Sequence, residues 1–165
     1  MIVETILEAI KFIFPAYCAN AIPVLLGGGL PLDFNKKFRD GKSLFGPSKT
    51  FKGFFSGLVI GTLVGVAESQ VFGFHIMFGF ATALGALLGD LVKSFVKRRL
   101  GIPSGSTLPI ADQLDFVVGA LVFSFLVAPP QITFPAALVV ILITPPIHFL
   151  TNFGAYLLHI KKKPW

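Results

Sequence analysis

The chain has 165 residues, of which 54% are hydrophobic and 13% charged, and its mean hydropathy is +0.81. Soluble domains carry about 25% charged residues, so this apolar excess is too large for one globular core and predicts an integral membrane protein. The single cysteine, Cys18, excludes an internal disulfide framework and a multi-cysteine metal site.

The first half of the chain predicts two membrane spans joined by a basic loop. Residues 2–26 form the first apolar span, which ends at a glycine-rich breaker. No basic segment precedes this span, so we expect it to remain a helix and not to be a cleaved signal peptide. After the loop, a second span covers about 53–73 with glycine at every fourth position from Gly53 to Gly65. Such a stripe lets a neighbouring helix approach closely.

The second half predicts three further spans, at about 76–94, 112–128 and 132–160. Gly85 and Gly89 give the first of them a similar small face. The last would reach roughly 43 Å, more than a hydrocarbon core of about 30 Å, so we expect it to tilt and to bend at Pro145-Pro146. The terminal Lys-Lys-Lys-Pro-Trp predicts an interfacial anchor. Residues 1–165 therefore predict a single, all-α membrane-embedded domain.

The basic residues predict the orientation of these helices. Every Lys and Arg except Lys11 lies in the segment 31–52, in the segment 93–111 or in the C-terminal tail. Five spans place these three segments on one side, which the positive-inside rule makes cytoplasmic. We therefore predict a polytopic protein of the cell membrane with five transmembrane helices, the N-terminus outside and the C-terminus cytoplasmic. The net charge of +6 then follows from topology, and no nucleic-acid partner is expected.

Polar residues concentrate where the third span ends and the fourth begins. Asp90, Lys93 and Lys97 fall at i, i+3 and i+7, which places them on one stripe of a helix. Asp112 and Asp115 are three residues apart at the start of the next apolar run. A helical hairpin would bring the three carboxylates together beside a basic rim. This pattern is typical of a site for a divalent metal and phosphate.

Simpler roles stay open for some of these residues. Lysines at helix ends commonly snorkel to the interface and fix orientation. Asp112 could cap the fourth helix, with Asp115 favoured by the helix dipole. Asp90 is harder to explain in this way, because the dipole disfavours a carboxylate near a helix C-terminus. His148 and Asn152 share one face of the fifth span, where interhelical hydrogen bonding is the simpler explanation.

The chemistry that fits these groups is phosphoryl or nucleotidyl transfer at the cytoplasmic membrane surface. Such reactions need Mg²⁺ on carboxylates and cations around the phosphates. The sequence has no HExxH, GxSxG, P-loop or CxxC motif, so zinc hydrolysis, serine hydrolysis and Walker-type ATP hydrolysis have no support. A lipid or polyprenol kinase that uses CTP or ATP stays open. A small transporter with Asp90 and His148 on its ion path is less favoured, because no internal repeat is evident.

Four long motifs lie along the chain: PAYCANAIPVL (15–25), LPLDFNKKFRDGK (30–42), LFGPSKTFKGFFSG (44–57) and GDLVKSFVKRRLGIPSG…LPIADQLDFVVGA (89–120). In content and order they resemble the archaeal CDP-archaeol synthases, membrane cytidylyltransferases related to the CDP-diacylglycerol synthases. The resemblance implies transfer of CMP from CTP to an unsaturated archaetidic acid, a 2,3-di-O-geranylgeranylglyceryl phosphate, with release of pyrophosphate.

Within that reaction the charged residues would take definite roles. Asp90, Asp112 and Asp115 would hold the Mg²⁺ cofactor and, with Lys93, form the catalytic group. Nucleotide and phosphate binding would fall to Lys49, Thr50, Lys52, Lys97, Arg98 and Asn20.

One region departs from the wider family. The CDP-diacylglycerol synthases carry a Lys-Asp pair after the basic helix and a Pro-Gly-His-Gly-Gly stretch before Asp-Arg-x-Asp. Here residues 102–104 read Ile-Pro-Ser, and Leu-Pro-Ile-Ala precedes Asp112-Gln-Leu-Asp115. The two closing aspartates are kept, whereas the glycine-rich phosphate contacts are absent. The sequence therefore does not show how this branch holds the triphosphate.

Overall fold

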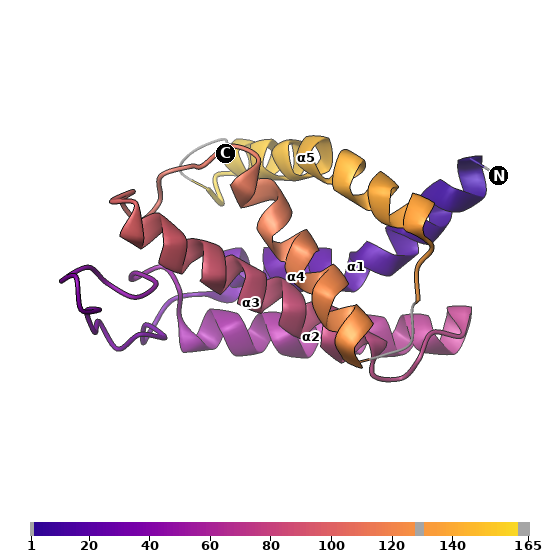
Figure 1. Cartoon of the computed structure of the whole chain (residues 1–165), viewed down its shortest axis with the longest axis horizontal. Coiled ribbons are helices and arrows are strands. Elements are labelled where there is room, and N and C mark those ends of the chain that lie inside the picture. Colours follow the sequence, from indigo (N-terminus) through magenta and orange to yellow (C-terminus); the bar gives the residue numbers. More distant parts are fainter. Residues whose placement is uncertain (1, 128–130, 162–165) are drawn as a thin grey trace.

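A computed structural model describes residues 2–127 and 131–161, and these residues form helices and loops without a strand. The helices are α1 (Ile2–Leu26), α2 (Phe51–Phe72), α3 (Phe78–Arg99), α4 (Ala111–Val127) and α5 (Phe134–Leu157). Along the chain α1 packs on α2, α2 on α3 and α3 on α4, while α5 contacts α1 and α4. In Figure 1, α5 lies along one edge of the bundle.

The predicted spans agree with the helices, with differences at their ends. α3 continues to Arg99, so the basic stripe is helical to its end, and α5 stops at Leu157. Helix α5 continues through Pro145 and Pro146, and α1 through its own two prolines. Neighbouring helices and local adjustments make prolines tolerable in membrane helices. The predicted span end at 128–130 and the anchor at 162–165 lie outside the described residues.

The described helices make this chain a membrane protein. Four of them, α1, α2, α3 and α5, are long and apolar enough to cross a bilayer. Helix α4 has 17 residues, which is at the short limit of about 17–25 residues for a spanning helix.

Both predicted glycine faces are helix contacts. Gly57 and Gly61 of α2 face the backbone of α1, and Gly65 faces Gly79 of α3. Between α3 and α4, a Cβ added at Gly119 would lie 2.0 Å from the carbonyl oxygen of Gly85. Only a residue without a side chain allows backbones to approach so closely. This contact fixes α4 against the stripe of α3 that carries Asp90.

The core occupies the half of the bundle that is remote from the long loops. Its largest buried side chains are Phe12, Phe78 and Phe116. Helix α5 is joined to α1 there, because the hydroxyls of Tyr17 and Thr144 lie 2.9 Å apart. Beyond this contact the bundle holds a large cavity, which is described below.

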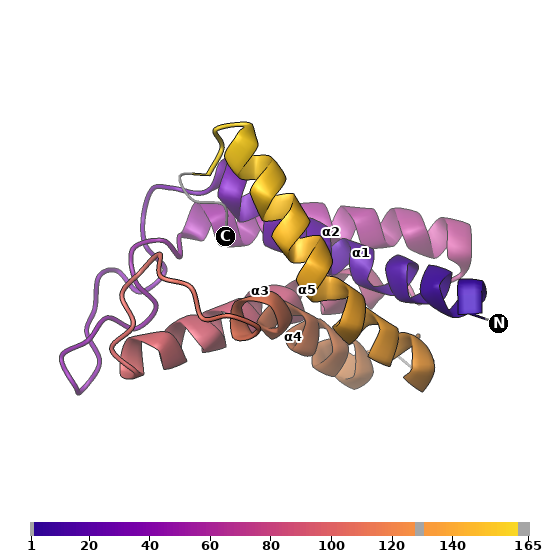
Figure 2. The same cartoon turned by 90° about the horizontal axis from the view of Figure 1, so that it is seen from above.

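Two loops lie together at the opposite end of the bundle, 27–50 and 100–110 (Figure 2). The first is tied to the end of α3 by Arg99, whose Nε lies 3.0 Å from the carboxylate of Asp40 and whose Nη2 donates to the Ser43 carbonyl. The hydroxyls of Ser48 and Ser104 lie 3.1 Å apart and join the loops directly. Segments far apart in sequence thus meet over the end of α3.

Candidate active site

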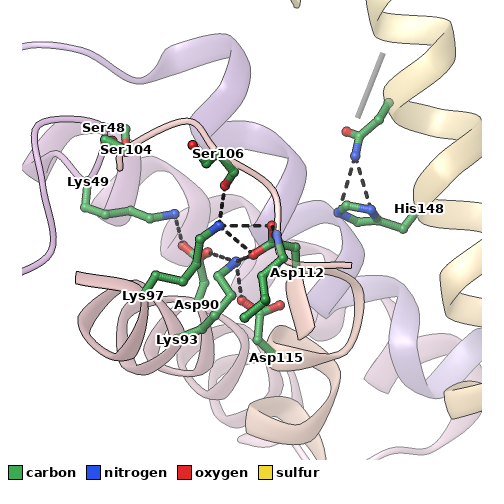
Figure 3. Close-up of polar contacts among 12 residues, drawn as sticks. Ser48, Lys49, Asp90, Lys93, Lys97, Ser104, Ser106, Asp112, Asp115 and His148 are labelled. Atoms are coloured by element: carbon green, nitrogen blue, oxygen red, sulfur yellow. Dashed lines mark hydrogen bonds and ion pairs between the residues drawn. The ribbon is translucent and has the colours of Figure 1, made fainter. Parts of the chain in front are cut away.

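Three carboxylates from two helices converge on one ammonium group. Lys93 Nζ lies 3.0 Å from Asp90 Oδ1, 3.2 Å from Asp112 Oδ1 and 2.6 Å from Asp115 Oδ2 (Figure 3). The four side chains are only 7–18% exposed. The predicted meeting of the two aspartate sets is therefore present, and a lysine lies at its centre.

The helix packing explains this arrangement. A Cβ at Gly89 would lie 2.3 Å from the carbonyl oxygen of Asp115, so the backbones of α3 and α4 touch at that point. Asp90 follows the contact on α3, and Lys93 stands three residues later on the same stripe. The sequence periodicity places the α3 groups, and the glycine contact brings α4 to them.

Two further lysines complete the carboxylate–lysine cluster, which comprises Asp90, Lys93, Asp112 and Asp115 together with Lys49 and Lys97. Lys49, from the first loop, donates a short hydrogen bond to Asp90. Lys97 Nζ lies 3.0 Å from each carboxylate oxygen of Asp112 and also donates to the carbonyl of Ser106. Three carboxylates and three ammonium groups are thereby balanced in a largely buried place.

Asp112 has a second function in addition to its ion pairs. Its Oδ2 accepts a 2.6 Å hydrogen bond from the backbone N–H of Leu108, in the turn before α4. Helix α4 begins at Ala111, so Asp112 lies within the helix and the alternative that it caps α4 is wrong. The same carboxylate closes the turn and faces two lysines.

The donor set fits a divalent cation. Among the described residues, no three His, Cys, Asp or Glu side chains already form a group that could hold a metal. However, the three carboxylates all contact one cationic atom, Lys93 Nζ. Carboxylate oxygens are the ligands that Mg²⁺ prefers. The chemistry of the cluster therefore suits a cation of higher charge in exchange for the ammonium.

A cavity of about 1020 Å³ opens beside the cluster. Asp90, Lys93, Lys97, Arg98 and Asp112 line it on the side of α3 and α4, and Asn20 lines it from α1. Arg98 is itself buried, and its Nε has no hydrogen-bond partner within the described part of the chain. Typical ligand pockets measure about 300–1,000 Å³, so this cavity lies at the upper end of that range.

Two of the predicted nucleotide-binding residues lie elsewhere. Thr50 caps α2: its Oγ1 accepts hydrogen bonds of 3.2 Å from the N–H groups of Gly53 and Gly28. Lys52 is exposed in the first turn of α2. Neither lines the cavity, whereas their neighbour Lys49 does. The structure thus brings together Lys49, Lys97, Arg98 and Asn20 from the predicted set.

Sequence reasoning missed Asp33, a buried carboxylate that organises the first loop. Its two oxygens accept 3.0 Å hydrogen bonds from the backbone N–H groups of Asn35, Phe45 and Gly46. Burial alone would raise the pKa of Asp33, but these N–H donors hold it below its usual value. The loop that carries Lys49 is therefore built on a charged acceptor. In the sequence, only the Asp-x-Asn triplet at residues 33–35 could have indicated that this aspartate binds backbone N–H groups.

Polar groups of α5 line the far side of the same cavity. Asn152 Nδ2 lies 3.1 Å from His148 Nδ1, so these two side chains hydrogen-bond within α5. Lys161 Nζ donates to Asn152 Oδ1 at 3.0 Å. Burial lowers the pKa of Lys161, and the Asp112 carboxylate opposes that shift. Periodicity placed His148 and Asn152 on one face, but it did not show that this face lines a cavity.

Comparison with known proteins identifies the family. The family model described as "CarS-like: CDP-archaeol synthase" matches residues 2–165. The chain belongs to the CDP-archaeol synthase family. A CDP-archaeol synthase of Pyrococcus furiosus is 45% identical over 97% of this chain and 98% of its own length. One from Methanopyrus kandleri is 44% identical over 96% of this chain and 92% of its own.

A solved structure extends this family likeness to the fold. It is described as an intramembrane enzyme for archaeal membrane lipids biosynthesis. It matches with a TM-score of 0.82 and 40% identity, and the match covers 89% of this chain and 94% of that chain. The arrangement of helices in this CDP-archaeol synthase family member is thus shared by a protein that works within the membrane.

Proposed function

We propose that this chain transfers CMP from CTP to the phosphate of an unsaturated archaetidic acid, a 2,3-di-O-geranylgeranylglyceryl phosphate. The products are CDP-archaeol and pyrophosphate. The observation that carries this proposal is the convergence of Asp90, Asp112 and Asp115 with three lysines beside a large cavity, in a chain that belongs to this family. Cations around a buried anion-binding cavity are what nucleotidyl transfer requires.

The bond changes in this reaction are simple. An oxygen of the lipid phosphate attacks the α-phosphorus of CTP and forms a new phosphoanhydride bond. The bond between the α-phosphorus and the bridging oxygen breaks, and pyrophosphate leaves with the electron pair. Negative charge develops on the leaving group, so the protein contributes by positioning the two phosphates and by neutralising that charge.

Asp90, Asp112 and Asp115 are the residues that would hold Mg²⁺. Bound there, the ion would supply positive charge to the triphosphate and orient it. Lys93, Lys97 and Arg98 line the cavity and can donate to phosphate oxygens. Lys49 brings a further cation from the first loop, and Asn20 offers an amide from α1.

The membrane arrangement that we propose has five transmembrane helices, with the N-terminus outside and both long loops in the cytoplasm. Helix α4 then crosses despite its length. In support, the backbone N–H of His75, after α2, donates a 2.8 Å hydrogen bond to the Gln131 side chain, after α4. The residues after α2 and α4 thus lie at one end of the bundle, opposite the basic loops. CTP would enter from the cytoplasm and the lipid from the membrane.

The test is product analysis with purified protein in detergent. CTP, Mg²⁺ and the geranylgeranylated glycerophosphate should yield CDP-lipid and pyrophosphate in equal amounts. Asp90→Asn and Asp115→Asn should each lower the rate by roughly 10²–10³-fold, since each removes buried charge that the reaction uses. Lys37→Gln, at an exposed loop position outside the cavity, is the control and should stay within about twofold. Full activity in both cluster variants would remove the metal assignment.

The same experiment separates the kinase alternative. A kinase transfers the γ-phosphoryl group and leaves CDP or ADP, and it releases no pyrophosphate. Detection of phosphorylated lipid with CDP would therefore replace the proposed reaction. The family membership favours the cytidylyltransferase.

A further inference from the structure

We propose that His148 and Asn152 of α5, with Lys161 just after this helix (together called the α5 polar row), bind the phosphate of the lipid substrate. They would do so across the cavity from the carboxylate–lysine cluster that serves the nucleotide. The inference rests on the proposed function, and it assigns a second anion-binding site within the same cavity. It gives the acceptor phosphate and the donor triphosphate separate protein partners.

The three side chains hold one another in place. Lys161 Nζ donates to Asn152 Oδ1 at 3.0 Å, which turns the amide nitrogen towards His148. Asn152 Nδ2 lies 3.1 Å from His148 Nδ1. The same amide nitrogen lies 3.5 Å from His148 Nε2, so it can donate to either ring nitrogen, and the ring nitrogen that does not accept can carry a proton. The row thereby presents an imidazole N–H, an amide and an ammonium, which are all donors for a phosphate.

The row faces the cluster from the opposite wall of the cavity. His148, Asn152 and Lys161 all line the cavity that Asp90, Lys93 and Asp112 line from the other side. In Figure 3, His148 lies apart from the cluster, on α5. Its ring stacks at 6.2 Å on that of Phe116, the residue after Asp115. Phe116 is fully buried, so it sets the position of the imidazole relative to the cluster.

The apolar lining beside the row indicates what kind of molecule carries the phosphate. Phe14, Val24 and Leu25 of α1 and Phe149 of α5 line the cavity and are about half exposed, so each is only partly covered by the protein. In a membrane helix, apolar side chains that the protein leaves uncovered contact lipid chains. The cavity is therefore bordered by residues that face the bilayer between α1 and α5. A ligand with an anionic head and long apolar chains fits this place better than a nucleotide does.

Electrostatics favours separate binding sites for the nucleotide and the lipid phosphate. The cluster lysines are already paired with carboxylates, so the cluster with its six charges is neutral before any metal binds. The positive charge of bound Mg²⁺ would be offset by the negative charge of the CTP triphosphate. A lipid phosphate brings additional negative charge close to these phosphates, and that charge is repelled unless other donors face it. The α5 polar row provides such donors on the side from which the lipid would arrive.

The test uses Asn152→Leu and Lys161→Met, with two measurements for each. The affinity for CTP with Mg²⁺ is measured by calorimetry without lipid. Binding of the geranylgeranylated glycerophosphate, and of the same lipid without its phosphate, is measured by native mass spectrometry. We expect CTP affinity within about twofold of wild type. The preference for the phosphorylated lipid should fall at least tenfold, and the KM for that lipid should rise correspondingly.

Thr151→Val is the matched control. Thr151 also lines the cavity on α5, but its hydroxyl donates to the carbonyls of Ile147 and His148 in its own helix. This variant should keep both affinities. Because retained CTP binding shows that a variant is folded, weak lipid binding then reports the row itself.

The outcomes are distinguishable. Unchanged preference for the phosphorylated lipid in both row variants would overturn the inference, as would a loss of CTP affinity in either. Wild-type protein that binds the phosphorylated lipid through the row but releases no pyrophosphate from CTP would refute the proposed reaction and leave the anion site intact.

Discussion

At the residue scale, the ammonium of Lys93 lies at the point on which Asp90, Asp112 and Asp115 converge. Three carboxylates with little exposure would repel one another without a cation between them. Lys93 supplies that cation in this structure. If Mg²⁺ binds these carboxylates as we propose, it would compete with the ammonium, and Lys93 would then be free to face phosphate.

This competition leads to a prediction for Lys93→Met. The variant should bind Mg²⁺ or Mn²⁺ about tenfold or more tightly without nucleotide, because the competing charge is gone while the carboxylates remain. Its turnover should nevertheless fall by roughly 10²-fold, since the phosphates lose a cation. Metal titration by calorimetry or by Mn²⁺ spectroscopy measures the first effect, and pyrophosphate release the second. Lys36→Met, on an exposed loop position, should change neither. Weaker metal binding in Lys93→Met would contradict the assignment.

Asp33 gives a pH-dependent prediction. Its folded-state pKa is lowered, so its stabilising effect is fully present above the unfolded value of 3.8 and is lost as pH falls through the folded value. Asp33→Asn replaces one acceptor oxygen by an NH₂ group that faces backbone donors. We expect the local free energy of opening of the 30–50 loop to fall by about 1–3 kcal/mol at pH 7. Hydrogen exchange of the Phe45 and Gly46 amides measures it. Equal protection in variant and wild type at pH 7 would refute this role.

Residue periodicity explains why part of the site could be predicted and part could not. Asp90, Lys93 and Lys97 follow from the helical repeat, because the stripe is local. The direction of Thr50 and Lys52 depends on where α2 begins, and the cap at Thr50 turns both away from the cavity. Asp33 binds residues more than ten positions further on in an irregular loop, and no repeat reports such a bond.

At the element scale, the contact between α3 and α4 determines the geometry of the cluster. The sequence predicted small faces on α2 and α3, but it did not identify the partner of Gly85 and Gly89. That partner is the α4 stretch from Asp115 to Gly119. A pairing of two specific helices is a tertiary property, which a single helix pattern leaves open.

Gly119→Ala tests this contact. Its Cβ would lie 2.0 Å from the Gly85 carbonyl oxygen, so the two helices must separate. We expect a loss of about 1–3 kcal/mol in unfolding free energy and a large loss of activity, because Asp115 moves away from Asp90. Thermal unfolding in detergent and pyrophosphate release measure the two effects. Gly154→Ala on α5 is the control, because nothing lies within 4 Å of the added Cβ. Equal behaviour of the two variants would show that the contact is not needed.

At the scale of the whole molecule, two loops and parts of four helices, α1, α3, α4 and α5, enclose one cavity. The positive charges predicted which segments share a side, and the structure places loops 27–50 and 100–110 together (Figure 2). What charge and hydropathy did not reveal is the opening of the bundle beside α5. The cavity lies there, lined by residues of both α1 and α5.

The crossing of α4, a helix of 17 residues, can be tested directly by cysteine labelling. Single cysteines are introduced in a Cys18→Ser background at four exposed positions. Lys37 and Ile76 lie on either side of α2, and Leu100 and Phe134 lie on either side of α4. With a membrane-impermeant maleimide, positions 76 and 134 should be labelled in intact cells, and positions 37 and 100 only after permeabilisation. The physical reason is the excess of Lys and Arg in the inner loops.

Two other labelling patterns would have different meanings. Labelling of 100 and 134 from the same side, with 37 and 76 on opposite sides, would show that α4 is re-entrant and that four helices cross. Labelling of positions 37 and 100 in intact cells would show that the protein has the opposite orientation in the membrane. The carboxylate–lysine cluster would then lie at the outer surface, where no cytoplasmic CTP could reach it. Because the cluster needs residues from α3, α4 and the first loop, the topology and the proposed reaction depend on each other.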